Sequence, residues 1–75
     1  MDGNIILNYN KLWKLMIDKN INKTQLHEKA QISTNAVAKM SRNETVSLET
    51  LVKVCYALDC SIGDVVEIVI EERRK

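Results

Sequence analysis

The chain of 75 residues contains no proline and no phenylalanine, and it has only two glycines. Folds built from repeated strands and tight turns use more glycine than this, so the composition favours a compact helical domain. Apolar runs long enough to span a bilayer are missing. Met1 is followed by Asp2 rather than by a basic segment and a long apolar core, so no secretory signal is recognisable. The expected location is therefore cytoplasmic.

Histidine and cysteine are scarce as well. His27 is the single histidine, and the two cysteines, Cys55 and Cys60, lie five positions apart rather than in a C-x-x-C pair. A four-ligand zinc site cannot be built from these residues, so we expect no metal, no other cofactor, and two reduced thiols. A Ser/His/Asp set and a phosphate-binding glycine loop are also missing. The sequence therefore does not predict an enzyme.

What the chain does contain fits one small globular domain over residues 1–75, with a core at about 8–70. Hydrophobic residues make up 45% of the chain and charged residues 28%, as in ordinary folded proteins. The net charge of +1 hides an uneven distribution. Residues 11–42 carry seven Lys or Arg and two acids, whereas residues 43–70 carry one Lys and five acids. A polyanion would be attracted to the first half and repelled by the second.

Apolar spacing and capping residues predict helices over residues 9–19, 22–30 and 33–40, then a fourth helix that starts at Ser47 and closes at residues 59–61. Asn22 with Gln25 forms a capping-box pattern, and Ser33 is the expected cap of the third helix. In the fourth helix the apolar residues recur at helical spacing: Leu48, Leu51, Val52, Cys55 and Leu58. Residues 62–66 are expected to form a short fifth helix.

Both ends of the chain contain a segment with strand character, "DGNIIL" at 2–7 and "VEIVI" at 66–70. A single strand is not stable alone, so the two either pair with each other or pair across a dimer. Pairing within the chain is more economical and would cover the Trp13 and Ile17 ridge of the first helix. Residues 71–75, "EERRK", are expected to be a solvated, frayed tail.

The stretch "STNAVAKM", residues 33–40, divides into two faces when it is wound as a helix. Ala36, Val37 and Met40 lie on one side. The other side carries short polar groups, a methyl and a cation from Thr34, Asn35, Ala38 and Lys39, with Arg42 one turn beyond. This polar side has no acid, which is unusual for a plain solvated surface and suitable for a surface that meets base edges and phosphates.

The order of these elements resembles the lambda-repressor-like helix-turn-helix family, the Cro/repressor or xenobiotic-response-element type, and in particular its compact single-domain members. The resemblance extends over residues 12–68, with Leu26, Ile32 and Val37 at the positions that lock the second and third helices together. It implies an all-α, five-helix helix-turn-helix domain, with the terminal strands as an addition. Two residues depart from the family pattern. His27 stands where a small residue is usual, and Gln31 stands where the turn often has glycine.

The resemblance also implies a function and a set of contact residues. In the family the third helix lies in the DNA major groove, so Thr34, Asn35, Ala38 and Lys39 are the implied base contacts. The implied phosphate contacts are Lys23, Ser33, Arg42 and Asn43. The chain is thus expected to be a bacterial or phage transcriptional regulator, a repressor that binds double-stranded DNA as a homodimer.

An alternative interpretation is an antitoxin-like or adaptor module, whose main partner is another protein and whose DNA binding is secondary or lost. The wide apolar surface of the first helix and the near-neutral net charge favour it. A self-assembling structural module is a weaker third interpretation, because it does not explain the one-sided charge. The polar residues at 34 and 35 could also simply occupy a solvated first helical turn, where such residues are favoured.

Overall fold

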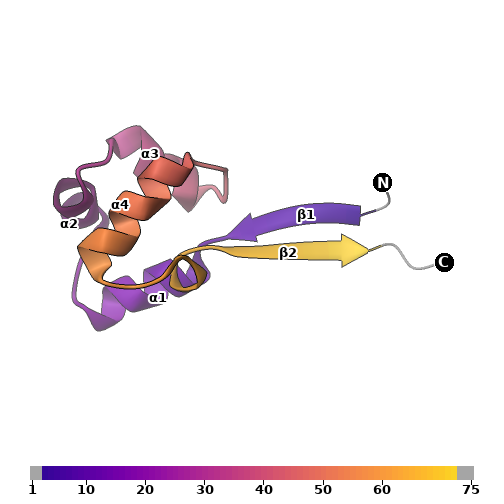
Figure 1. Ribbon diagram of the computed structural model, residues 1–75, viewed down its shortest axis with the longest axis horizontal. Helices are drawn as coiled ribbons and strands as arrows, with labels where there is room; N and C mark the ends of the chain where they lie inside the picture. Colours follow the sequence, from indigo (N-terminus) through magenta and orange to yellow (C-terminus); the bar gives the residue numbers. More distant parts are fainter. Residues whose placement is uncertain (1–2, 73–75) are drawn as a thin grey trace.

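Four short α-helices and a two-stranded ribbon make up the described part of the computed structural model, residues 3–72 (Figure 1). In chain order the elements are β1 (Gly3–Asn8), α1 (Asn10–Asp18), α2 (Lys23–Ala30), α3 (Thr34–Ser41), α4 (Leu48–Leu58), the 3₁₀ turn η1 (Ile62–Asp64) and β2 (Glu67–Glu72). Within residues 3–72 no helix is long and apolar enough to cross a membrane.

The helix starts lie where the capping residues predict them. The Asn22 side chain accepts a hydrogen bond from the Gln25 backbone N–H at 2.8 Å, and the Gln25 side chain accepts one from the Asn22 N–H at 2.9 Å. Ser33 caps α3 through the Ala36 N–H, and Ser47 caps α4 through the Thr50 N–H. These bonds satisfy backbone donors that have no partner inside the helix, each worth ~1 kcal/mol.

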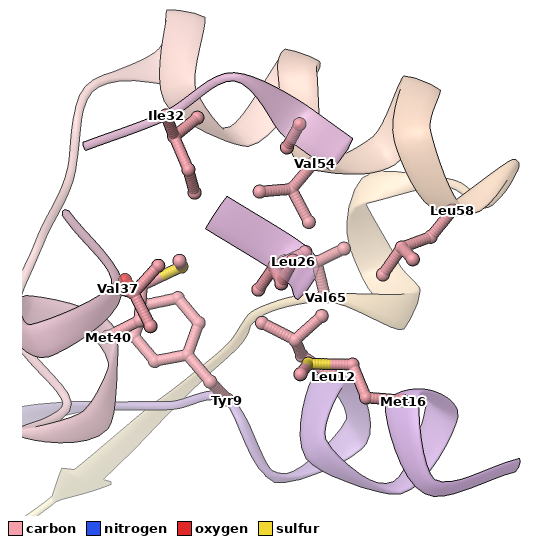
Figure 2. Close-up of a cluster of buried hydrophobic side chains, with 11 residues drawn as sticks. Tyr9, Leu12, Met16, Leu26, Ile32, Val37, Met40, Val54, Leu58 and Val65 are labelled. Carbon is pink, nitrogen blue, oxygen red and sulfur yellow. The ribbon is translucent and has the colours of Figure 1, made fainter. Parts of the chain in front are cut away.

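The core lies between the helices (Figure 2). It also includes Tyr9, which directly follows β1, and Val65, which lies between η1 and β2. Its buried residues are Tyr9, Leu12, Met16, Leu26, Ala30, Ile32, Val37, Met40, Val54, Leu58 and Val65. Because α1, α2, α3 and α4 all contribute, the core that the buried side of α3 joins includes side chains from outside the helix-turn-helix unit.

The inward face of α4 differs from the apolar pattern that the sequence suggests. Val54 and Leu58 are buried, with Leu51 half-buried, whereas Leu48 and Val52 are exposed. The helix carries two apolar stripes at helical spacing, and packing selects the one that contains Val54. The other stripe faces solvent.

Two expectations about the C-terminal part are wrong. The predicted fifth helix at 62–66 is only a three-residue 3₁₀ turn, so residues 3–72 contain four α-helices and not five. Val65 and Val66 are β-branched and lead directly into β2, which stops the helix from extending. Glu71 and Glu72 belong to β2 and not to a frayed tail, because their backbone pairs with Asn4 and Gly3. The rest of the predicted tail lies outside the described residues.

The terminal strands pair with each other, antiparallel and in register from Gly3 opposite Glu72 to Asn8 opposite Glu67. Pairing within one chain was the more economical expectation. The ribbon, however, runs outward from the helices and does not lie over α1 (Figure 1). Ile17 consequently remains 75% exposed, and the expectation that the strands cover the Trp13 and Ile17 ridge is wrong.

Candidate nucleic-acid interface

Helix α3 presents a polar face to solvent and an aliphatic face to the core. Val37 and Met40 are buried, whereas Thr34 and Asn35, in the first turn, are exposed. Ala38 and Lys39 are half-exposed one turn further along. The two faces predicted for "STNAVAKM" are therefore the two faces that the fold produces. The polar one is open to solvent.

The turn between α2 and α3 is built around a left-handed Gln31, with φ 57° and ψ 47°. This conformation costs a non-glycine residue energy, and the surrounding bonds hold it in place. The Ile32 N–H donates to the His27 carbonyl at 3.1 Å. The His27 ring nitrogen Nδ1 lies 2.7 Å from the Ile32 carbonyl oxygen, and with its proton on Nδ1 the ring donates to that oxygen. The Gln31 N–H also donates to the His27 carbonyl, so the two residues that depart from the family pattern are bonded to each other.

The Lys23 side chain spans three helices. Its ammonium lies 4.6 Å from the centre of the Trp13 ring on α1 and donates to Ser41 Oγ on α3 at 2.8 Å. Ser41 Oγ donates in turn to the Val37 carbonyl. Lys23 is exposed at the first position of α2. A cation is therefore held at the junction of α1, α2 and α3, on the side where the polar face of α3 ends.

Arg42 is paired with an acid just beyond α3. Arg42 Nε donates to Glu44 Oε2 at 2.9 Å, and Arg42 Nη2 donates to Glu44 Oε1 at 3.3 Å. The hydrogen bond from Arg42 lowers the pKa of the Glu44 carboxyl, and it raises the pKa of Arg42 in the same way. A phosphate that binds Arg42 must therefore share the guanidinium with Glu44 or displace that carboxylate.

Asn43 has a structural task of its own. It is left-handed, with φ 59°, and the Glu44 N–H folds back to the Lys39 carbonyl at 2.9 Å, which closes the end of α3. The hydroxyl of buried Tyr9 then donates to the Glu44 carbonyl at 2.7 Å. The loop that carries Arg42 and Asn43 is thereby tied to the start of α1.

The implied contact residues are exposed or half-exposed on α3 or beside it. Thr34, Asn35, Ala38 and Lys39 lie on the outer side of α3; Ser33 caps it; Lys23, Arg42 and Asn43 flank it. The residues that sequence reasoning missed are the ones that hold this set, Trp13, Ser41, Glu44 and Tyr9. An acid two positions after Arg42 was a readable signal, but the Tyr9 to Glu44 bond joins residues 35 positions apart. Among residues 3–72 no group of three or more His, Cys, Asp or Glu side chains could hold a metal ion.

Comparison with known proteins agrees with this fold. The model of the Cro/C1-type helix-turn-helix DNA-binding domain matches residues 11–71. The crystal structure of the transcriptional regulator VanUg, form II, is similar at 42% sequence identity and a TM-score of 0.84, over 89% of each chain. Among proteins with curated descriptions, none matches this chain significantly. The chain belongs to the Cro/C1-type helix-turn-helix DNA-binding family.

Proposed function

We propose that this protein is a transcriptional repressor that binds double-stranded DNA as a homodimer, with α3 in the major groove. The observation that supports it best is the exposed polar face of α3 on a buried aliphatic side. One helix in one groove reads few bases, so two copies would occupy half-sites about 34 Å apart. The protein would work by binding rather than by catalysis, and in the cytoplasm of a bacterium or in a phage-infected cell.

Base readout would come from the first turn and a half of α3. Asn35 can bind an adenine through its N6 and N7 atoms, and Lys39 can donate to guanine O6 and N7. Thr34 offers a hydroxyl and a methyl, and Ala38 is small enough to let the helix backbone approach. Affinity independent of sequence would come from Lys23, Ser33, Arg42 and Asn43 at the phosphates.

The test is a selection of bound sequences from random duplexes, followed by affinity measurements over a range of salt concentrations. Asn35→Ala should relax the preference at one base position, a loss of ~1–3 kcal/mol of discrimination. Lys23→Ala should weaken binding to all sequences alike and reduce the salt slope by ~0.9. Lys53→Ala is the matched control, because it removes the same charge from α4 beside Glu49. Binding that does not respond to salt, or a control that behaves like Lys23→Ala, contradicts the proposal.

A second candidate function, an antitoxin-like or adaptor module, is favoured by the exposed stripe on α4. Leu48, Val52 and Tyr56 follow one another at intervals of four along the helix, and Tyr56 is 89% exposed. The stripe borders a hollow between α2 and α4 that Lys29 also lines. Stoichiometric co-purification with one protein, lost in Tyr56→Ser but kept in Asn35→Ala, together with no DNA retardation, would favour this function over repression.

A further inference from the structure

The four α-helices of residues 3–72 all end with the same backbone motif. Each is followed by a left-handed residue, and the N–H after that residue donates to the carbonyl five positions earlier. The left-handed residues are Asn20, Gln31, Asn43 and Asp59. The bonds run from Ile21 to Met16, from Ile32 to His27, from Glu44 to Lys39 and from Cys60 to Cys55, at 2.8, 3.1, 2.9 and 3.0 Å. This is the bond pattern of the Schellman motif, in which the side chains of the two bonded residues are frequently in contact.

The ends of α1 and α2 show what this motif does to the pair of side chains that it joins. Met16 and Ile21 are both apolar, and they line the same hollow beside the end of α1. His27 and Ile32 are joined a second time, because the ring nitrogen Nδ1 of His27 lies 2.7 Å from the Ile32 carbonyl oxygen. In this fold the motif therefore makes neighbours of two residues that are five positions apart in sequence.

At the end of α4 both of these positions are cysteines. The left-handed Asp59 also donates its N–H to the Tyr56 carbonyl at 3.3 Å, which completes the motif. Cys55 and Cys60 are free and half-buried, and they line one surface hollow together with Tyr56 and Lys29. Burial is the largest cause that raises the pKa of the Cys60 thiol to about 11, and the neighbouring Cys55 adds to the rise. The two thiols therefore lie side by side at a surface that small molecules can reach.

We propose that Cys55 and Cys60 are a dithiol modification site, which a low-molecular-weight disulfide oxidises to a disulfide bond within one chain. Such a bond requires two residues whose Cα atoms lie about 4.4–6.8 Å apart and whose side chains face each other. The backbone bond between the two cysteines and their shared hollow meet the requirement of proximity. The site is on α4 rather than α3, so it does not depend on the proposed function.

The reaction proceeds by two thiol–disulfide exchanges. The thiolate of Cys55 attacks one sulfur of the oxidant, forms a mixed disulfide and expels the first thiolate. Cys55 is the attacking residue because the raised pKa of Cys60 keeps that thiol protonated near neutral pH. Cys60 then gives its proton to water and attacks the Cys55 sulfur, and the second thiolate leaves. The protein loses two electrons and two protons, and the oxidant takes up both and departs as two thiols.

The test holds the full chain without oxygen in buffers of stepped reduced-to-oxidised glutathione ratio, then quenches with acid and counts free thiols by alkylation and intact mass. The wild type should convert to a species that has lost two hydrogen atoms, with the helix content of the reduced protein by far-UV circular dichroism. Its oxidation should be about tenfold or more favoured in the folded chain over the chain in concentrated urea, because only the folded chain contains the motif.

The matched control exchanges two neighbours, Cys60→Ser with Ser61→Cys, which keeps the composition and moves one thiol out of the motif. Its oxidation in the folded state should be about tenfold or more less favoured than that of the wild type. The comparison with urea uses the wild type alone, so it decides the question even where the exchanged variant does not fold.

Four results would overturn the proposal: a folded wild type that keeps both thiols in buffers that oxidise the unfolded chain, a mixed disulfide with glutathione that persists, disulfides between two chains, or an exchanged variant that oxidises as readily as the wild type. DNA retardation is measured separately on the reduced protein. A chain that forms the internal disulfide and binds no DNA would contradict only the proposed function.

Discussion

Tyr9→Phe removes a single oxygen atom from the core and leaves the aromatic ring in place. That oxygen belongs to the hydroxyl that donates to the Glu44 carbonyl at 2.7 Å. Tyr9 is buried, whereas Glu44 is exposed, so water can reach the carbonyl once the hydroxyl is gone. The loss should therefore be that of one ordinary hydrogen bond, ~1 kcal/mol. For a domain of this size it corresponds to a fall in Tm of about 4–8 °C.

The measurement is urea or thermal unfolding at pH 7, followed by far-UV circular dichroism. Tyr56→Phe is the matched control, because Tyr56 is 89% exposed and its hydroxyl contributes little to the folded state. The reasoning fails if Tyr9→Phe is as stable as the wild type, or if the control loses the same amount.

The same variant has a predictable dependence on pH. Burial raises the pKa of the Tyr9 hydroxyl above its ordinary value of about 10. The folded state therefore favours the protonated form, and this contribution to stability is complete below about pH 10 and is lost as the pH rises through the raised pKa. The wild type should lose its advantage over Tyr9→Phe in this alkaline range. An advantage that is constant up to pH 11 or beyond contradicts the assignment.

Three further predictions rest on other local features. Gln31→Gly should stabilise the fold by ~1 kcal/mol in urea titrations, because glycine adopts the left-handed conformation without strain; Gln31→Ala, which keeps the strain, should not. Glu44→Gln should release Arg42, tighten binding to every DNA sequence and steepen the salt slope by up to ~1. An equal effect from Glu49→Gln on α4 would contradict that explanation. Burial, with smaller contributions from neighbouring acidic groups, raises the pKa of the Cys60 thiol to about 11. Its alkylation in the folded protein should therefore be slow at pH 8 and accelerate towards pH 11, and an ordinary rate at pH 8 would refute the burial argument.

Local signals allowed much of the fold to be predicted from the sequence. Asn22, Ser33 and Ser47 cap the helices that they were expected to cap, because a cap is made by residues within three positions of each other. The polar and aliphatic faces of α3 were predictable for the same reason. Helical periodicity over eight residues already separates them.

Helical periodicity did not predict which face of α4 is buried, because two apolar stripes on this helix satisfy it equally. On α4 the stripe through Leu48 and Val52 and the stripe through Val54 and Leu58 are both apolar, and only packing against the other helices decides between them. The predicted fifth helix failed because backbone pairing of β2 with β1, about 65 residues away in sequence, competes with helix formation after Asp64.

Of the contacts that arrange the candidate site, only the acid two positions after Arg42 leaves a signal in the sequence. From the sequence, Trp13 is expected only to be covered by the terminal strands, yet its ring lies beneath the Lys23 ammonium. The family resemblance implies that Arg42 contacts a phosphate, and the structure shows that it is paired with Glu44. Both contacts are made by long side chains with several rotamers each, and the sequence does not determine which rotamer is adopted. The residue types at these positions were visible, and their pairing was not.

If Lys23 binds a phosphate as proposed, its position links the stability of the fold to the strength of DNA binding. A free lysine loses rotamer freedom when it is fixed at a phosphate, at a cost of up to ~2 kcal/mol. In this fold Ser41 Oγ accepts one of its three ammonium hydrogens, and the centre of the Trp13 ring lies 4.6 Å from the same nitrogen. The side chain is therefore ordered before DNA arrives, and at least one N–H remains for a phosphate. On the proposed function, packing among α1, α2 and α3 would therefore reduce the entropic cost of binding. A change at Trp13 that loosens this packing should then reduce affinity for every sequence alike, although Trp13 itself need not touch DNA.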